Sequence, residues 1–369
     1  MKNEILQGVS RKDWTKGDIV HVVRNELGDW TQDRCNYEPQ KWGNWDTNEC
    51  AQLSSINSVE TQCNYLKRTG QFSSEALKWF TDNGYFDENG RFDFSERFTA
   101  ILAGCSINGS SQWWAWQSMK TFGLLPWKDF HYSVEQAQKF STQQAMGADY
   151  YDEAQITPVM RDKALQALKW INIEYEWLRN QGKNAGDFTG DFLTELKQSP
   201  IGLGVPICGS GWNSTNPPAC TLNTAHHAVM CYKLGSKVIW DHYQPATKEL
   251  PDDYTVFLAI KGVVTASPIN NFKHTFYIDL KYGDGLNDGK TFEVAQLQTA
   301  LMSLGFRIPA LEGNDGAKGY FGTQTKSALF EFQKKYVSPV SWTNWLAVWT
   351  GLGRYCYSLT RQALNRIFS

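Results

Sequence analysis

Hydrophobic residues in the first half of the chain recur at helical spacing. Leu53, Ile56, Val59, Cys63 and Leu66 follow one another at intervals of three or four residues, which predicts a buried helix over residues 50–66. The same analysis predicts helices over residues 109–122 and 158–179. The first half of the chain is therefore expected to be mainly helical.

The pattern changes from residue 201 onward. Ile201, Leu203, Val205 and Ile207 alternate with Gly and Pro, and short apolar runs follow over residues 228–232, 237–240 and 255–260. Helices that precede antiparallel strands in this order are typical of an α+β domain. We expect a helical half to pack against a sheet half, with a cleft between them.

A polar stretch rich in turn-forming residues separates this domain from a smaller one. We place the first domain at residues 1–264, a linker at 265–284 and a second domain at 285–369. In the second domain Val294, Leu297 and Leu301 recur at helical spacing, and further helices are predicted to begin near Thr323 and Ser358. The second domain is therefore expected to be a small all-α unit of three helices.

Charge and composition exclude several classes of protein. The 36 Lys and Arg residues against 38 Asp and Glu residues give a net charge of −2, which excludes a nucleic-acid reader that works through bulk positive charge. No apolar run approaches the ~18 residues that a membrane span needs. The first residues lack the apolar core of a secretory signal, so we expect no signal peptide and synthesis in the cytoplasm. The sequence carries no signal for an oligomeric state.

The eight cysteines include no CxxC pair, which argues against a zinc knuckle. Cys208 and Cys220 flank a loop rich in Gly, Ser, Asn and Pro; they can pair in an oxidising compartment or stay as thiols in a cytoplasm. The adjacent His226 and His227 have no Cys or carboxylate at metal-ligand spacing. The sequence therefore predicts neither a metal nor a cofactor.

Cys50 is the first candidate for chemistry. It stands in the first turn of the helix predicted over residues 50–66, where the positive end of the helix dipole stabilises a thiolate. The alternative is that Cys50 is one more small buried hydrophobic residue. Glu49 immediately precedes it and adds a negative charge, which is expected to raise the pKa of the thiol and oppose the dipole.

A histidine and a carboxylate on neighbouring strands are the second part of the candidate site. His227 opens one strand and Asp241 ends the next, so the imidazole can accept the Cys50 proton while the carboxylate fixes its tautomer. A plain two-residue turn at residues 235–236 would put His227 and Asp241 on opposite faces. We therefore predict a three-residue loop at 234–236 or a bulge. His226 points the other way in that register and is the second candidate for the base.

These segments resemble the papain-like cysteine peptidases of the prokaryotic and viral branch, over about residues 30–264. The resemblance lies in residues 44–60, 94–98, 108–109, 123–126, 227–229 and 240–243. It implies a two-lobed fold with Cys50 as nucleophile, His227 as general base and Asp241 as the orienting residue, where the family usually has Asn. Tyr243 stands where the family has a Trp that shields the histidine.

The same resemblance implies a side-chain amide that stabilises the oxyanion. The family places a Gln six residues before the nucleophile, and in this chain that position is Asn44. Asn44 has the same amide on a shorter arm, so it is the fourth candidate catalytic residue. The nearest Gln upstream is Gln40.

The second domain resembles the three-helix type of peptidoglycan-binding domain. The matching segments are residues 294–298, 304–306, 319–325, 328–333 and 359–365, and they include a Gly-x-Phe-Gly-x-x-Thr turn. The resemblance implies bacterial peptidoglycan as a partner. A docking module with another ligand is the alternative.

Together the two resemblances predict a cell-wall-targeted cysteine peptidase that cleaves peptide bonds, possibly of peptidoglycan itself, as a bacteriophage lysin or virion-associated lytic protein. It would act at the cell wall or as a virion component. The alternatives are an inactive papain-like scaffold with a structural or adhesive role in a virion, and an ordinary protein-processing peptidase.

Overall fold

The computed structural model describes residues 24–178, 183–184, 189–234, 237–267, 274–285, 288–304, 306, 308, 311, 318–337 and 355–368. The chain divides into two compact units, Met1–Ala266 and Ser267–Ser369. The division follows the last strand of a large sheet, and each unit has its own hydrophobic core.

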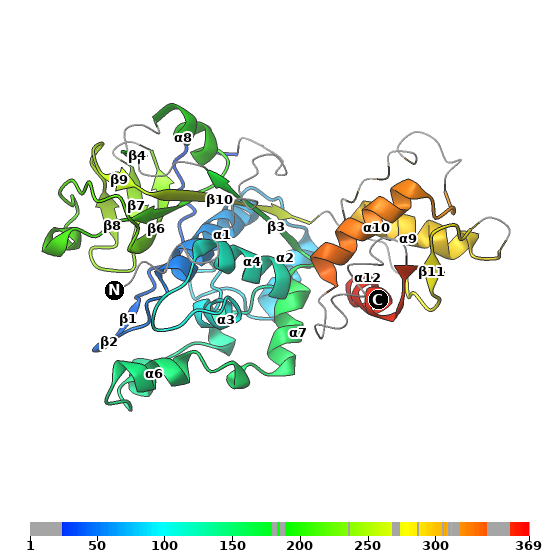
Figure 1. The fold of residues 1–369 in the computed structure, drawn as a ribbon, viewed down its shortest axis with the longest axis horizontal. Coiled ribbons are helices and arrows are strands. Elements are labelled where there is room, and N and C mark those ends of the chain that lie inside the picture. Colours follow the sequence, from blue (N-terminus) through cyan, green and yellow to red (C-terminus); the bar gives the residue numbers. More distant parts are fainter. Residues whose placement is uncertain are drawn as a thin grey trace. The chain divides into compact units, whose positions relative to one another are not determined.

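Most helices of the first unit come before its large sheet in the sequence (Figure 1). They are α1 (Cys50–Arg68), α2 (Ser74–Asp82), α3 (Glu96–Leu102), α4 (Gln112–Phe122), α5 (Val134–Ala137), α6 (Gln143–Tyr150) and α7 (Pro158–Ala167). Ser and Thr side chains accept a hydrogen bond from the first turn of most of them; Ser111, for example, caps α4. That cap explains why α4 begins at Gln112 rather than at the predicted residue 109.

An antiparallel sheet of six strands forms the second half of this unit, in the order β3, β10, β5, β6, β7, β8. The strands are β3 (Ile171–Leu178), β5 (Ile201–Val205), β6 (His227–Lys233), β7 (Val238–Trp240), β8 (Thr247–Glu249) and β10 (Leu258–Ala266), with α8 (Thr189–Leu196) between β3 and β5. Two small pairs join β1 (Lys41–Trp42) to β2 (Trp45–Asp46) and β4 (Lys183–Asn184) to β9 (Thr255–Val256). The predicted α+β class is confirmed.

Helix α1 lies between the sheet and the other helices (Figure 1). It contacts β6 and β10 on one side and α3 and α4 on the other. The hydrophobic residues that predicted this helix, such as Leu53 and Ile56, are 0% exposed. Each fully buried side chain of this size contributes about 1.5–3 kcal/mol. Cys50, at the start of α1, is therefore held on a rigid element.

The prediction of one helix over residues 158–179 is wrong. Helix α7 ends at Ala167, and β3 begins at Ile171 and pairs along its length with β10. β3 carries β-branched and aromatic residues, such as Ile171, Ile173 and Tyr175, which fit a pleated strand better than a helix. Residues 171–178 therefore form a strand that pairs with β10, although the spacing of the apolar residues in this segment also suits a helix.

Of the two alternatives predicted for the hairpin after β6, a three-residue loop at 234–236 or a bulge, the bulge is present, whereas residues 235–236 lie outside the described part of the chain. The pairing of β6 with β7 shifts by one residue between Cys231 and Lys233, so β6 carries one extra residue there. Because side chains alternate between the two faces of a strand, the shift puts His227 and Asp241 on the same face.

Three helices form most of the described part of the second unit: α9 (Thr291–Ser303), α10 (Thr323–Tyr336) and α12 (Ser358–Phe368). A short strand pair, β11 (Leu280–Lys281) with β12 (Tyr355–Cys356), accompanies them. Val294, Leu297, Leu329 and Phe332 lie in the core of this unit. The prediction of a three-helix domain is confirmed.

The predicted linker over residues 265–284 is too long. Phe276 is 1% exposed and Leu280 is 0% exposed, and both lie in the core of the second unit. Phe276 and Leu280 stand among polar residues in the sequence, so the hydrophobic pattern does not indicate that they are buried. The described residues from 274 onward belong to the second unit, whereas residues 268–273 lie outside the described part of the chain.

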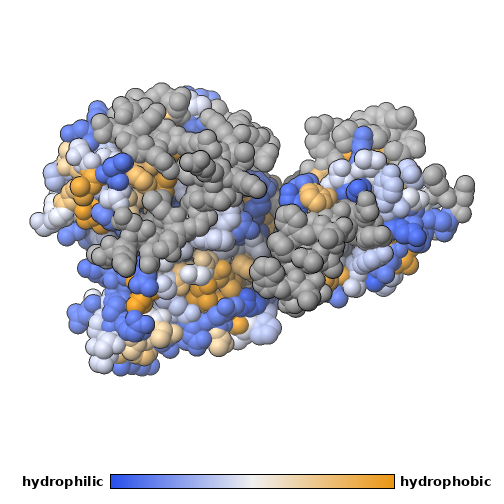
Figure 2. All heavy atoms as spheres, viewed as in Figure 1, coloured by the Kyte–Doolittle hydropathy of each residue, from blue (hydrophilic) through white to orange (hydrophobic). Residues whose placement is uncertain are grey.

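Among the residues that are coloured in Figure 2, hydrophilic ones are common and hydrophobic ones gather in a few separate patches. Among the described helices, none is long and apolar enough to cross a membrane.

Candidate active site

The candidate site forms where α1 begins, beside the first residues of β6. Cys50 is the first residue of α1 and packs with Ala51 against Ala228 of β6. Its side chain is almost buried, with 7% of the residue exposed. Asn48, just before the helix, has a φ of 57°, a left-handed conformation that Asn tolerates better than most residues. The chain therefore turns sharply into α1.

His227 joins Cys50 to Asp241. Its Nε2 lies 2.6 Å from Oδ1 of Asp241, and the ring lies close enough to Cys50, which packs against the neighbouring Ala228, for the two side chains to interact electrostatically. Because Nε2 is bonded to Asp241, Nδ1 is left for Cys50. His226, the second candidate, is exposed, and its backbone N–H donates to Val205. The structure thus brings together Cys50, His227 and Asp241.

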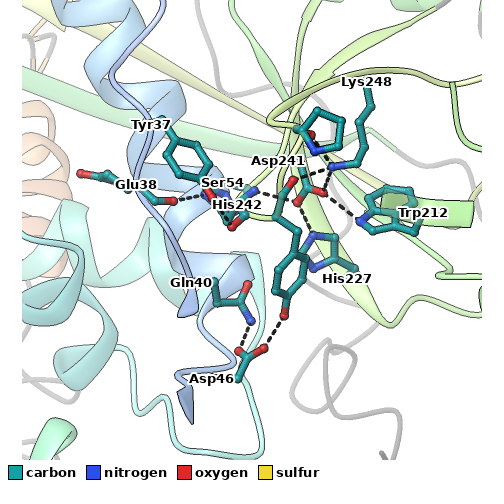
Figure 3. A network of polar contacts seen from close by, with 12 residues as sticks. Tyr37, Glu38, Gln40, Asp46, Ser54, Trp212, His227, Asp241, His242 and Lys248 are labelled. Atoms are coloured by element: carbon teal, nitrogen blue, oxygen red, sulfur yellow. Dashed lines mark hydrogen bonds and ion pairs between the residues drawn. The ribbon is translucent and has the colours of Figure 1, made fainter. Parts of the chain in front are cut away.

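Asp241 is fully buried and accepts four hydrogen bonds (Figure 3). Oδ1 accepts from His227 and from the backbone N–H of His242 at 2.7 Å. Oδ2 accepts from Nε1 of Trp212 at 2.8 Å and from Nζ of Lys248 at 2.6 Å. Four donors match the capacity of an ionised carboxylate. Asp241 is therefore fixed as an anion.

The electrostatics of the pair favour a charged histidine. Burial alone would lower the pKa of His227, but the negative charges of Asp241 and Cys50 and the hydrogen bond with Asp241 raise it to about 10. Burial alone would raise the pKa of Asp241, but the charge and hydrogen bond of His227 and the charge of Lys248 lower it well below its ordinary value. A protonated imidazole beside Cys50 stabilises the thiolate.

A second histidine stays neutral. Burial lowers the pKa of His242 to about 4. Its Nδ1 lies 3.3 Å from the backbone oxygen of Glu38, which ties the segment before β1 to the strand end that carries Asp241.

Tyr243 and Gln40 extend the network on the other side of His227. The Tyr243 ring lies 5.1 Å from the His227 ring, and its hydroxyl donates to Oδ2 of Asp46 at 2.7 Å. Gln40 donates from Nε2 to Oδ1 of the same Asp46 at 2.7 Å. Tyr243 therefore covers the histidine on one side, and Figure 3 shows Gln40 pointing to the carboxylate below it.

The structure separates Asn44 from this network. Asn44 lies in the turn between β1 and β2 and is exposed. Gln40 is 1% exposed, and its Oε1 is buried with no hydrogen-bond partner. Of the two side-chain amides considered in the sequence analysis, Gln40 is therefore the one that lies in the network beside His227.

Glu49 is buried and points to Tyr150. The Tyr150 hydroxyl lies 2.7 and 2.8 Å from the two carboxylate oxygens, and the Thr47 hydroxyl donates to one of them at 2.8 Å. Burial raises the pKa of Glu49 to about 7, although these hydrogen bonds oppose the rise. Near neutral pH, Glu49 therefore carries less negative charge than its sequence position beside Cys50 suggests.

Glu49→Gln is expected to flatten the pH dependence of stability. Because the folded pKa of about 7 lies above the ordinary 4.5, the stability that protonated Glu49 contributes is complete below pH 4.5 and is lost as pH rises through 7. The loss is on the order of 3 kcal/mol. Urea unfolding at pH 5 and pH 8 measures it, and wild type should lose stability relative to Glu49→Gln. An equal difference between the two proteins at both pH values would contradict this.

Three residues of the site were not predicted from the sequence. They are Trp212, Lys248 and Tyr150. Trp212 lies in a loop that a disulfide between Cys208 and Cys220 closes, so the structure takes the oxidised alternative of the two left open. A single aromatic residue in an otherwise polar loop gives little indication that its side chain is buried against the site. Lys248 lies between Thr247 and Glu249 and gives no such sign, because a charged strand of this kind is typical of a solvated edge.

Part of the second unit matches a known protein family. Residues 292–341 match the family described as "Putative peptidoglycan binding domain". This match covers α10 and most of α9. The peptidoglycan-binding domain predicted from the sequence is confirmed as a family match.

Solved structures that resemble the chain include papain-like cysteine proteases. Xylellain, a cysteine protease from Xylella fastidiosa, is 16% identical with a TM-score of 0.48, and the match covers 73% of this chain and 96% of that one. The digestive procathepsin L 3 of Tenebrio molitor is 12% identical with a TM-score of 0.41, over 64% and 68% of the two chains. The clostridial cysteine protease Cwp84 is 12% identical with a TM-score of 0.40, over 69% and 62%. No curated protein matches the sequence.

Proposed function

We propose that this chain is a cysteine peptidase targeted to the bacterial cell wall, with Cys50, His227 and Asp241 as its catalytic residues. The observation that carries the proposal is that His227, bonded at Nε2 to Asp241, lies beside Cys50 at the start of α1, with all three residues buried. A cysteine at a helix start, beside a histidine fixed by a carboxylate, is the arrangement that nucleophilic thiol catalysis requires.

In the proposed reaction the Cys50 thiolate attacks the carbonyl carbon of a peptide bond. The resulting tetrahedral intermediate collapses to a thioester as His227 gives its proton to the leaving amine. Water then attacks the thioester, with His227 as the base, and releases the acid and the thiol. Asp241 keeps the imidazole in one orientation throughout and stabilises its positive charge.

The proposed oxyanion donors are the backbone N–H of Cys50 and the amide of Gln40. An amide nitrogen has two hydrogens, and the bond from Gln40 to Asp46 uses one of them. We assign this role to Gln40 instead of Asn44, because Asn44 is exposed in a turn. Preorganised donors of this kind stabilise the charge that develops on the carbonyl oxygen.

The family match at residues 292–341 supports the cell wall as the place of action. A wall-binding domain raises the local concentration of the peptidase at its substrate without new contacts at the cleavage site. We propose the stem or cross-bridge peptides of peptidoglycan as substrates, and a phage lysin or virion-associated lytic protein as the biological setting.

The test uses the full chain and purified peptidoglycan sacculi, with release of new amino groups as the measurement. The matched control is the same protein after alkylation of Cys50 with iodoacetamide. The proposal predicts release by the untreated protein only, and sedimentation of both proteins with the sacculi. Sedimentation without any release would instead support the alternative of a wall-adhesion scaffold.

A further inference from the structure

Three carboxylates from distant parts of the sequence meet beside α1, away from Cys50. Glu38 lies before β1, Glu60 lies on α1 and Asp93 lies just before α3. One oxygen from each lies within 4.8 Å of the others. Glu60 is buried, whereas Asp93 is partly exposed, so the cluster is reachable from solvent. Carboxylates this close repel one another strongly unless protons or a cation offset their charge.

No basic side chain offsets the charge of this cluster in the described part of the chain. The ion pairs there join Lys, Arg and His to other carboxylates. The hydrogen-bond donors that face the cluster are neutral. Nδ2 of Asn57 donates to Glu38 at 3.2 Å, and the backbone N–H of Phe94 donates to Glu60 at 2.7 Å.

Two residues next to the cluster carry a buried oxygen without a hydrogen-bond partner: Oδ1 of Asn57, whose nitrogen donates to Glu38, and Oε2 of Glu96, whose carboxylate interacts electrostatically with Glu38 and Glu60. Asn57 is 0% exposed, and Glu96 is 2% exposed. The Asn57 amide is aimed into the cluster, because its nitrogen contacts Glu38. A half-turn of that amide would exchange the nitrogen for the unpartnered oxygen and make Asn57 a ligand.

We propose that Glu38, Glu60, Asp93 and Asn57 form a calcium site. Every donor is an oxygen, which is the ligand set of a hard divalent cation. Ligands on opposite sides of Ca²⁺, at roughly 2.3–2.6 Å each, lie roughly 4.6–5.2 Å apart, and the three carboxylate oxygens fit within that span. Magnesium demands a near-ideal octahedron at roughly 2.0–2.1 Å and gives up its waters reluctantly, so a site built mainly from protein oxygens favours calcium.

The ion would connect three segments that position the candidate active site. Glu38 stands two residues before Gln40, and its backbone oxygen accepts from His242 (Figure 3). Glu60 belongs to the helix that begins with Cys50. The calcium site would therefore fix the Gln40 segment against α1, but it does not depend on whether Cys50 hydrolyses peptides.

Calcium binding to the full chain tests the proposal. The protein is stripped with EDTA, exchanged into metal-free buffer at pH 8 and titrated with CaCl₂ by calorimetry, with the melting midpoint as a second measurement. We expect a saturable site, weaker binding of MgCl₂ and a rise of the melting midpoint with CaCl₂. Asp93→Asn should weaken binding at least tenfold, whereas Asp82→Asn, the same change at an exposed acid, should leave it unchanged.

Two results would overturn the proposal. One is a wild-type titration without saturable heat or a change in midpoint, which would mean that protons alone offset the cluster. The other is wild-type affinity in Asp93→Asn, which would place the ion elsewhere in the chain. If Asp93→Asn does not fold, Glu38→Gln tests the same site: unchanged calcium affinity would then count against it, and weakened affinity would support it.

Discussion

Gln40→Ala is expected to lower kcat on wall peptides by about 10²–10³-fold, the usual cost of one oxyanion-hole donor. The effect should fall on kcat rather than on KM, because the amide acts on charge that develops only in the transition state. Release of amino groups from purified sacculi, followed over a range of substrate concentrations, measures both constants.

Asn44→Ala is the matched control, since it removes the same amide from the exposed turn between β1 and β2. We expect its activity to lie within about twofold of wild type, as is usual for a surface substitution that breaks no contact. Equal losses in both variants, or a large loss in Asn44→Ala alone, would count against the role assigned to Gln40.

Lys248→Met is expected to lower the free energy of unfolding by about 3–5 kcal/mol. Lys248 is 0% exposed, and its ammonium donates to Oδ2 of Asp241 and to the backbone oxygens of Tyr243 and Pro245, at 2.6, 2.6 and 2.5 Å. Methionine fills a similar volume but leaves a buried carboxylate and two carbonyls without that donor. Urea unfolding of both proteins at pH 7 gives the difference.

Lys78→Met makes the same substitution at an exposed lysine, whose side chain is 76% accessible and pairs with Asp82 on α2. A pair of this kind is worth less than about 1 kcal/mol. A loss in Lys248→Met no larger than that in Lys78→Met would show that Lys248 does not hold Asp241 in place.

Local patterns predicted the parts of the site that depend on one or two elements. Helix α1 could be predicted from the spacing of its apolar residues alone, and the structure buries each of the residues that gave this spacing. The bulge between Cys231 and Lys233 follows from geometry, because His227 and Asp241 can share a face only if the register shifts. Both predictions need no knowledge of the rest of the fold.

Counting along the chain failed where a hairpin intervenes. The β1–β2 hairpin lies between Gln40 and Thr47, and the backbone N–H of Thr47 donates to the oxygen of Gln40 at 3.1 Å. Gln40 is thus brought beside the start of α1 despite its distance in sequence, whereas Asn44 is carried out to the turn. Distance along the chain does not measure distance in space when the segment between folds back on itself.

Contacts between segments that are distant in the chain could not be predicted from the sequence either. Lys248 and Trp212 reach Asp241 from separate loops and strands. Glu38, Glu60 and Asp93 are too far apart in the chain to form a recognisable ligand motif, yet they meet in the fold. Such groups have no local signature, because only tertiary packing brings their charges together.

The pH dependence of Cys50 alkylation shows directly whether Cys50 and His227 form a thiolate–imidazolium pair. Wild type and His227→Ala are treated with iodoacetamide from pH 5 to pH 10, and the Cys50 peptide is followed by mass spectrometry, with the buried Cys63 as internal reference. We expect rapid alkylation of Cys50 well below the ordinary thiol pKa of ~8.5, and we expect His227→Ala to lose it. Alkylation that follows an ordinary thiol titration in both proteins would contradict a thiolate–imidazolium pair and, with it, the proposed peptidase.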